Sequence, residues 1–153
     1  MPSRVQLALN VTDIEAATAF YRELFGVEPA KTRRGYANFE IVDPPLKLVL
    51  FESPGAVSPL NHVGVEVSSR AEVANAAERF TVAGLAHQMT DADRCCYAVQ
   101  DKLWVEAPDV PLGGWEFYTV LADDPSQGDG CASDSCCGSV SSAAPSDSTT
   151  GEV

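Results

Sequence analysis

Basic residues are scarce in this sequence. It has 10 Lys and Arg against 22 Asp and Glu, which gives a formal net charge of −12 and a pI of about 4.3. Such a chain repels the phosphates of DNA and RNA, and it repels an anionic membrane surface in the same way. The composition therefore argues against nucleic acid and against anionic membranes as partners.

Long apolar runs are also absent. No segment reaches the roughly 20 apolar residues that a membrane-spanning helix needs. The apolar run in residues 5–9 is too short for the core of a signal peptide, and no small-residue cleavage site follows it. We therefore expect a cytoplasmic protein, and we expect its five cysteines to be reduced thiols rather than disulfides.

The C-terminal segment lacks the residues that build a core. From Asp123 to Val153 there is no Lys, Arg, Leu, Ile or aromatic residue, and Ser, Gly, Asp, Thr and Ala dominate. Such a segment buries too little apolar surface to offset the entropy lost on ordering. We expect a disordered acidic tail over residues 123–153 and a folded part over residues 4–122.

The folded part repeats one pattern. A strand pattern is followed by a capped helix that ends at a glycine, and strand-like runs come next. The expected strands are 5–11, 27–32, 36–42 and 46–52, then 62–67, 85–90, 96–100, 103–106 and 115–121, with helices after Asp13 and after Ser69. Aligning Gln6 with His62 also aligns Leu7 with Val63. We therefore predict an α+β fold of paired βαβββ modules, residues 4–53 and 60–122, that enclose a cavity.

Three polar residues in the expected strands are candidate metal ligands. Gln6 and His62 hold matching positions at the start of each module, and Glu116 stands between Trp115 and Phe117. A buried carboxylate between aromatic residues is costly without a cation or a partner. An imidazole, a carboxylate and an amide oxygen resemble the two-His-one-carboxylate triad of non-haem Fe(II) oxygenases, with one His replaced.

Simpler interpretations of these residues remain open. A lone His on a strand is more often a hydrogen-bonded core residue, and a Glu in a strand is usually on the solvent face. Glu52 holds the place in the first module that matches Glu116, and it is a lower-ranked fourth ligand.

The vicinal pair Cys95-Cys96 suggests a site for a soft ion. Neighbouring side chains of an ideal strand point to opposite faces, so both thiols reach one ligand only where the backbone is irregular. The polar run 91–94 predicts such a loop. Two thiolates suit As(III), and Arg94 would favour the thiolate form. The alternative is a pair of small residues at a strand edge.

Three further cysteines lie in the expected tail, where there is no core to pack into. They are Cys131, Cys136 and Cys137. They suggest scavenging of a soft ion, or they are incidental to the composition.

Six stretches of the sequence together form a specific pattern. They are Val-Gln-Leu-Ala-Leu-Asn-Val (5–11), Gly-Tyr-Ala-Asn-Phe (35–39), Asp-Pro-Pro-Leu-Lys-Leu-Val-Leu (43–50), Leu-Asn-His-Val-Gly-Val-Glu-Val (60–67), Cys-Cys-Tyr-Ala-Val-Gln-Asp-Lys (95–102) and Trp-Glu-Phe-Tyr-Thr-Val-Leu (115–121). These stretches resemble the ArsI-type carbon–arsenic lyases and the closely similar cadmium-induced proteins. Both groups belong to the vicinal oxygen chelate superfamily, with glyoxalase I and the ring-cleaving extradiol dioxygenases.

The resemblance implies a function and a set of site residues. It implies a non-haem Fe(II) enzyme that uses O₂ to cleave the carbon–arsenic bond of methyl and aromatic trivalent organoarsenicals. The products would be inorganic arsenite and an oxidised organic fragment, which is a detoxification. The implied residues are Gln6, His62 and Glu116 as metal ligands, Cys95 and Cys96 as substrate thiolates, and Tyr97 and Tyr118 as catalytic hydrogen-bond donors. His87, beside a helix end, is expected to be structural.

Two other functions stay open at this point. One is a non-enzymatic protein that binds cadmium or arsenite through its thiols. The other is a glyoxalase-type lyase that uses Ni²⁺ or Zn²⁺, with Glu52 as a fourth ligand. His, Glu and Gln accept several divalent ions, so Ni, Zn, Mn and Co remain alternatives to iron. The sequence leaves open the choice between methyl and aromatic substrates and between a monomer and a homodimer.

Overall fold

A computed structural model describes residues 2–95 and 97–124 of the chain. Within them the strands form one eight-stranded sheet in the order β2-β3-β4-β1-β5-β8-β7-β6. The elements are β1 (Arg4–Val11), α1 (Ile14–Phe25), β2 (Lys31–Arg33), β3 (Tyr36–Ile41), β4 (Leu46–Glu52), β5 (Leu60–Glu66), α2 (Arg70–Ala83), β6 (His87–Cys95), β7 (Ala98–Glu106), the 3₁₀ turn η1 (Pro111–Gly113) and β8 (Gly114–Asp123). None of the helices in this part of the chain has the length and apolarity to cross a membrane.

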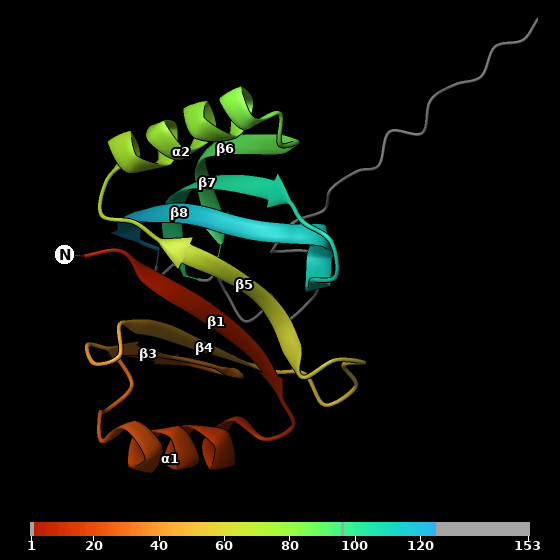
Figure 1. The fold of residues 1–153 in the computed structure, drawn as a ribbon. Helices are drawn as coiled ribbons and strands as arrows, with labels where there is room; N and C mark the ends of the chain where they lie inside the picture. The colour runs from red at the N-terminus through yellow and green to blue at the C-terminus, as the bar shows by residue number, and fades with distance from the viewer. Residues whose placement is uncertain (1, 96, 125–153) are drawn as a thin grey trace, which may run out of the picture.

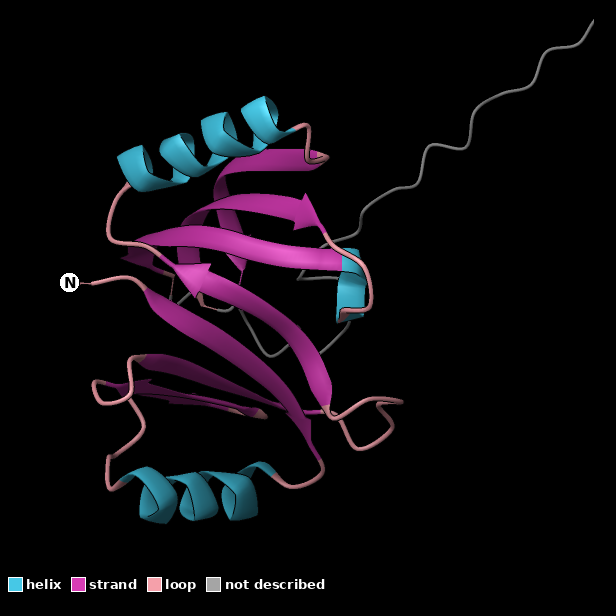
Figure 2. Cartoon of the chain, in the orientation of Figure 1, coloured by secondary structure: helices cyan, strands magenta, loops and turns pink. Residues whose placement is uncertain are grey.

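The order β-α-β-β-β occurs twice, so the predicted α+β fold of paired modules is confirmed. In each module the first strand pairs in parallel with the last, β1 with β4 and β5 with β8. The modules join where β1 and β5 pair antiparallel. Figures 1 and 2 show the strands lying between the two helices, with α1 at one end of the molecule and α2 at the other.

Both helices begin and end where the sequence predicts. Asp13 accepts a hydrogen bond from the Ala16 backbone N–H at 3.0 Å and so caps α1. Ser69 caps α2, with its side chain accepting from the Glu72 N–H. Gly26 and Gly84 end the two helices in the left-handed conformation, at φ of 65° and 70°.

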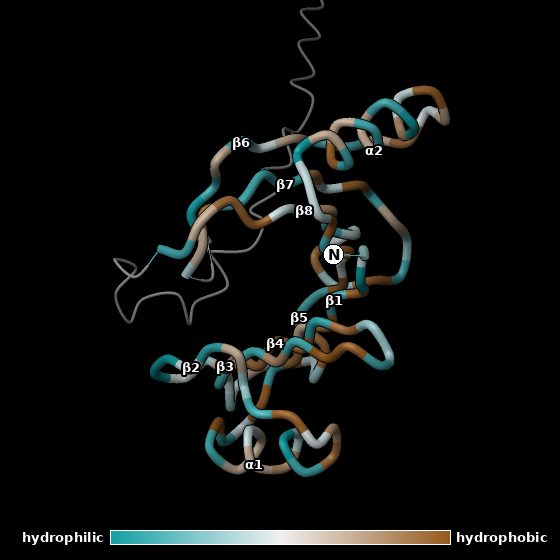
Figure 3. Tube along the Cα trace, turned by 90° about the vertical axis from the view of Figure 1, so that its left-hand side faces the viewer, coloured by the Kyte–Doolittle hydropathy of each residue, from teal (hydrophilic) through white to brown (hydrophobic). Residues whose placement is uncertain are grey.

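Strand alternation separates two apolar cores from an inner face that carries buried polar residues and a smaller apolar cluster with Tyr36, Val49 and Phe51. One core lies between α1 and the first module, and the other between α2 and the second. Figure 3 shows from a second direction that α1 and α2 lie on opposite sides of the strands. The two cores contain Ala37, Phe39, Ile41, Leu48 and Leu50 on one side, and Val67, Val73, Ala76, Phe80, Leu103 and Val105 on the other. Residues one position away along each strand face inward, and they form the wall of the candidate site.

Two details of the predicted strands are wrong. The runs 96–100 and 103–106 are one strand, β7, because the charged residues between them are buried and paired. Asp101 binds Arg70 at 2.7 Å, and Lys102 contacts Asp93 at 3.1 Å. The expected run 27–32 is a strand only over Lys31–Arg33.

The predicted loop at 91–94 belongs to β6 instead. Its backbone is nevertheless irregular, because the pairing with β7 shifts between Thr90 and Asp93 and Ala92 has a φ of 49°. The Asp101 carboxylate stabilises this bulge by accepting a hydrogen bond from the Ala92 N–H at 2.8 Å.

The described part of the chain reaches slightly past Ala122. β8 ends at Asp123, whose carboxylate binds Lys31 at 2.6 Å. Asp124 is 5% exposed and binds Arg94 at 3.0 Å. Cation partners in the folded part therefore hold the first two residues of the predicted tail. The rest of that tail, residues 125–153 with Cys131, Cys136 and Cys137, lies outside the described residues.

Candidate metal centre

A cavity of about 310 Å³ lies on the inner face of the sheet. Both modules contribute to it through alternate residues of their strands. On β3 these are Tyr36, Asn38 and Glu40, and on β8 they are Glu116, Tyr118 and Val120. The cavity is therefore lined by polar and apolar side chains from the sides of the strands that face away from the two cores.

The three predicted ligands come together in this cavity. Gln6, His62 and Glu116 lie on β1, β5 and β8, which are neighbours in the sheet. The Gln6 Nε2 lies 2.9 Å from His62 Nε2 and 3.0 Å from Glu116 Oε2. His62 Nε2 and Glu116 Oε2 are 3.4 Å apart. All three are buried, with 6%, 2% and 2% of their surfaces exposed.

Gly64 leaves the space in which these side chains meet. It pairs with Gln6 on one side and with Glu116 on the other. A Cβ at this position would lie 2.8 Å from the Glu116 carbonyl oxygen and 3.2 Å from its Cβ. The backbone of β8 can come this close to β5 only because residue 64 has no side chain.

We therefore expect Gly64→Ala to displace Glu116. The added methyl group overpacks a rigid strand pair, which typically costs about 1–3 kcal/mol of stability. We expect a lower melting temperature together with weaker retention of added Fe(II), measured by metal analysis after gel filtration. Val63→Ala is the control, because the side chain of residue 63 lies on the opposite face of β5. Iron retention in Gly64→Ala equal to that of the unchanged protein would contradict this account.

A neighbouring asparagine fixes the proton on His62. His62 Nδ1 lies 2.7 Å from Asn61 Oδ1, and the Asn61 Nδ2 donates to Asn10 Oδ1 at 2.9 Å. Since the Asn61 oxygen only accepts, Nδ1 carries the proton and Nε2 presents a lone pair to the cavity. This is the usual way in which a second residue orients a metal-binding imidazole. Sequence reasoning missed Asn61, although it directly precedes His62.

The donor set at this point fits a divalent cation. The Gln6 Nε2 donates toward two acceptors, His62 Nε2 and Glu116 Oε2, while its Oε1 accepts from the Tyr118 hydroxyl. A cation would satisfy the same two acceptors, and a half-turn of the Gln6 amide would add its oxygen as a third ligand. No group of three His, Cys, Asp or Glu residues in the described ranges could hold a metal, so the set depends on Gln6.

Glu116 stays ionised in this buried place because of its neighbours. Burial alone raises the pKa of Glu116, but the charge of Lys102 outweighs it. The pKa of Glu116 is thereby lowered from 4.5 to about 2. Lys102 Nζ lies 3.3 Å from Glu116 Oε1, and Lys102 is 3% exposed. Sequence reasoning missed Lys102 as part of the site.

The two predicted tyrosines have different surroundings. Tyr118 lines the cavity, and burial raises its pKa well above 10, so the phenol stays protonated and donates to Gln6. Tyr97 is buried with its ring 5.0 Å from that of Tyr36, and it is not among the residues that line the cavity. Its carbonyl accepts from Lys31 Nζ at 3.2 Å. Tyr97 therefore anchors the chain beside the cysteine pair.

The structure describes only part of the cysteine pair. Cys95 ends β6, where its backbone pairs with Ala98, and Tyr97 has a φ of 62°. Cys96 lies outside the described residues. The backbone is thus irregular at Tyr97, directly after the pair, and the role of the two thiols stays a prediction.

Two other residues singled out in the sequence lie away from the cavity. The Glu52 carboxylate accepts a hydrogen bond from the Ile14 N–H at 2.9 Å, at the start of α1. His87 Nδ1 lies 2.7 Å from the Leu85 carbonyl oxygen, just after α2. Neither lines the cavity, so Glu52 is not placed as a fourth ligand and His87 has a structural position.

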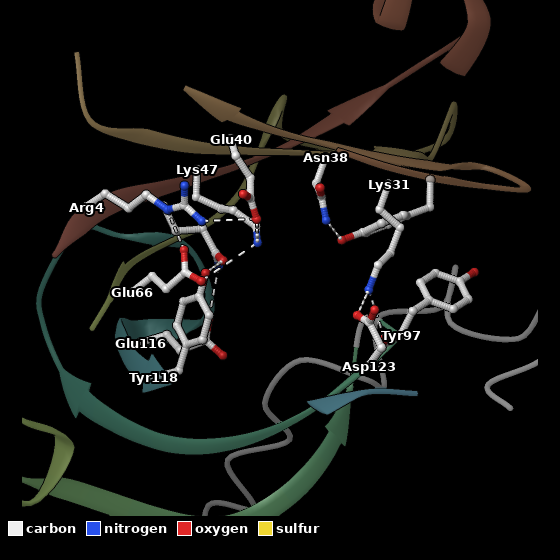
Figure 4. Close-up of polar contacts among 12 residues, drawn as sticks. Arg4, Lys31, Asn38, Glu40, Lys47, Glu66, Tyr97, Glu116, Tyr118 and Asp123 are labelled. Carbon is white, nitrogen blue, oxygen red and sulfur yellow. Dashed lines mark hydrogen bonds and ion pairs between the residues drawn. The ribbon is translucent and has the colours of Figure 1, made fainter. Parts of the chain in front are cut away.

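A second charged cluster, which the sequence did not indicate, borders the triad. Arg4 Nε binds Glu66 Oε2 at 2.6 Å, and Arg4 also approaches Glu40 at 3.3 Å. Lys47 lies 3.6 Å from Glu40 and 3.9 Å from Glu66. Figure 4 shows this cluster beside Glu116 and Tyr118, with Lys31 and Asp123 farther along the same space. The cluster neutralises buried charges next to the candidate ligands.

Comparison with known proteins gives consistent matches. The model of the Glyoxalase/Bleomycin resistance protein/Dioxygenase superfamily matches residues 4–125. The cadmium-induced protein CadI of Mycobacterium tuberculosis is 56% identical over 130 residues, 84% of this chain and 83% of that protein. A trivalent organoarsenical cleaving enzyme of Thermomonospora curvata is 54% identical over 124 residues, covering 79% and 80%. Homoprotocatechuate 2,3-dioxygenase of Arthrobacter globiformis shares the fold, with a TM-score of 0.51 at 20% identity over 78% of this chain and 36% of that one.

Proposed function

The chain belongs to the Glyoxalase/Bleomycin resistance protein/Dioxygenase superfamily, and from this membership we propose that it cleaves the carbon–arsenic bond of trivalent organoarsenicals. The proposed reaction consumes O₂, depends on Fe(II), releases inorganic arsenite and so detoxifies the arsenical. One observation carries the proposal: Gln6, His62 and Glu116 converge in a buried cavity. The identity of 54% to a trivalent organoarsenical cleaving enzyme supports it.

Gln6, His62 and Glu116 would hold the metal in this proposal. Bound Fe(II) would supply the activation of O₂, a role for which sites with one carboxylate and open positions are suited. Asn61 holds the imidazole with Nε2 toward the metal position, and Lys102 keeps the Glu116 carboxylate ionised. Tyr118 donates to the Gln6 oxygen, so the half-turn that would bring this oxygen to the metal would break that hydrogen bond.

Cys95 and Cys96 would bind the substrate in the proposal. The two thiols displace the two hydroxyls of R–As(OH)₂, each thiol proton leaves with a hydroxyl as water, and the arsenic is held as a dithiolate. Attachment to the protein makes the later bond cleavage effectively intramolecular. For methylarsenite, one O₂ and CH₃As(OH)₂ balance as As(OH)₃ and formaldehyde, so no added reductant is needed.

The test is anaerobic reconstitution of the protein with Fe(II), followed by methylarsenite and then O₂. We expect arsenite release only when iron, organoarsenical and O₂ are all present, with one O₂ consumed for each arsenite formed. Arsenite is measured by chromatography with element detection, and O₂ with an electrode. Arsenite release that continues without O₂ or without added metal would contradict the proposal.

A non-enzymatic sink for cadmium or arsenite is the second candidate. It is favoured by the identity of 56% to a protein named cadmium-induced. The same experiment distinguishes the two candidates. A binding protein would retain arsenical or cadmium at a fixed number of ions per protein, without iron and without O₂. A glyoxalase-type lyase is disfavoured, since the fourth ligand that it needs, Glu52, binds the Ile14 N–H instead.

A further inference from the structure

A β-bulge brings Asp93 to the inner face of the sheet. Thr90 of β6 pairs with Lys102 of β7. The next pair is Asp93 with Gln100, so β6 has one residue more than β7 in this interval. In a regular ladder Ala92 would stand opposite Gln100, and Asp93 would point to the other face. Because directly paired residues share a face, the extra residue places Asp93 on the face of Gln100 and Lys102, which line the cavity.

Asp93 and Glu116 contact the same lysine from two strands. Lys102 Nζ lies 3.1 Å from Asp93 Oδ2 and 3.3 Å from Glu116 Oε1. Lys102 is 3% exposed, whereas the side chain of Asp93 is 34% exposed. The two carboxylates come from β6 and β8, which lie on either side of β7 in the sheet (Figure 1). Since a buried ammonium needs partners of opposite charge, these two contacts fix its position.

The two carboxylate oxygens of Glu116 have different partners. Oε2 lies 3.0 Å from Gln6 Nε2 and 3.4 Å from His62 Nε2, where the three proposed ligands meet. Oε1 lies beside the Lys102 ammonium instead. A carboxylate binds a cation through one oxygen or through both, and an ammonium competes with the cation for the oxygen that it contacts. The contacts of Glu116 therefore favour binding through a single oxygen.

We propose that Lys102 and Asp93 are positioning residues that restrict Glu116 to binding the metal through Oε2 alone. The inference rests on the metal site of the proposed function. A second oxygen from Glu116 would occupy one of the open positions that a site with three protein ligands keeps for O₂ and substrate. Asp93 acts through Lys102, because it holds the ammonium beside the oxygen that stays off the metal.

The Co(II)-loaded protein provides the first measurement. Metal-free full-length protein is loaded with Co(II), whose visible absorption bands weaken as the number of its ligands rises, and the same complex is crystallised. In the wild type we expect one Glu116 oxygen about 2.0–2.2 Å from the ion, the usual distance for a carboxylate on zinc, and the other beside Lys102. Wild-type crystals with both oxygens on the ion, or with the ion away from Glu116, would overturn the inference.

Variants of the two positioning residues provide the second measurement. Lys102→Met removes the ammonium, and we expect both Glu116 oxygens on the ion and weaker visible bands. Lys102→Arg keeps a cation and should restore binding through one oxygen. Asp93→Ala should weaken the bands in the same direction, and it tests the inference even where Lys102→Met does not fold, because Asp93 is partly exposed. Binding through one oxygen in Lys102→Met, or an unchanged spectrum in Asp93→Ala, would overturn the inference.

Lys47→Met is the matched control. Lys47 also lines the cavity, but its carboxylate contacts are with Glu40 at 3.6 Å and Glu66 at 3.9 Å. We expect its Co(II) spectrum to equal that of the wild type. A change as large as that in Lys102→Met would make the effect a general one of cavity charge, and it would overturn the inference.

Failure of the proposed function looks different. In the iron-reconstituted wild type, absence of arsenite release from every organoarsenical would refute carbon–arsenic cleavage. Crystals that show one Glu116 oxygen on Co(II), and both in Lys102→Met, would still support the role of Lys102, because these measurements need no catalysis.

Discussion

Replacing Glu116 with Gln is expected to prevent the retention of added Fe(II). The substitution keeps the shape of the side chain but exchanges the only carboxylate among the three proposed ligands for a neutral amide. Loss of a supporting residue near a metal typically weakens binding about 10–100-fold, and loss of the charged ligand itself should reach or exceed the upper figure. We expect iron content near zero after reconstitution and gel filtration, and no arsenite release. Wild-type iron content in Glu116→Gln would remove this residue from the site.

The same substitution should also destabilise the protein. Lys102 is 3% exposed, and it would lose the Glu116 carboxylate at 3.3 Å. Breaking a buried ion pair from one side costs about 3–5 kcal/mol, and the remaining contact with Asp93 places our expectation at the lower end. Because the folded-state pKa of Glu116 is lowered to about 2, its contribution is complete above pH 4.5 and is lost as the pH falls toward 2. The free energies of unfolding of metal-free wild type and metal-free Glu116→Gln should therefore differ most above pH 4.5, and the difference should shrink as the pH falls toward 2.

Two controls separate metal binding from stability. The double variant Glu116→Gln with Lys102→Met also removes the cation that has lost its Glu116 partner, so it should recover much of the stability without recovering the metal. Glu66→Gln removes another buried carboxylate of the cavity, which pairs with Arg4 rather than with the triad. It should lose stability but keep the metal. If Glu66→Gln lost the metal as completely as Glu116→Gln, the effect would be a general consequence of the cavity charge.

The positions of the three proposed ligands could be anticipated because each interrupts an apolar strand. Gln6 and His62 match across the repeat, and Glu116 stands between aromatic residues that pack on the other face. Their convergence follows from the order β1-β5-β8, which the repeat implies but does not specify. The helix ends were predictable for a local reason, since Asp13 and Ser69 cap through bonds within one turn.

The residues that sequence reasoning missed are polar residues on the inner face. A Lys or Asn that alternates with apolar neighbours has the same pattern whether it faces water or a closed cavity. Lys102 and Asn38 therefore resemble solvent-facing residues, although they are 3% and 5% exposed. The adjacent charged residues Asp101 and Lys102, which are buried, also led the sequence prediction to divide β7 into two strands. Only the pairing of strands from both modules distinguishes these cases.

Replacing either Cys95 or Cys96 with Ser is expected to abolish turnover of methylarsenite. A serine hydroxyl does not bind As(III) as a thiolate does, and a single remaining thiol cannot form the dithiolate. Oriented attachment is worth an effective concentration of about 10⁵ M or more, so we expect turnover to fall at least about 1000-fold. Iron content should stay at the wild-type level, since neither cysteine belongs to the proposed metal ligands.

Truncation after Asp124 is the matched test of the other thiols. It removes Cys131, Cys136 and Cys137 but keeps the pairs of Asp123 with Lys31 and of Asp124 with Arg94. If substrate capture belongs to Cys95 and Cys96, the truncated protein should turn over methylarsenite at the wild-type rate, measured as arsenite released per iron. Full activity in both serine variants, or loss of activity in the truncated protein alone, would transfer the capture step to the C-terminal thiols. The truncation is placed after residue 124 because Asp123 pairs with Lys31. A truncation after Ala122 would remove this partner of Lys31, whose ammonium also donates to the carbonyl of Tyr97 beside the cysteine pair.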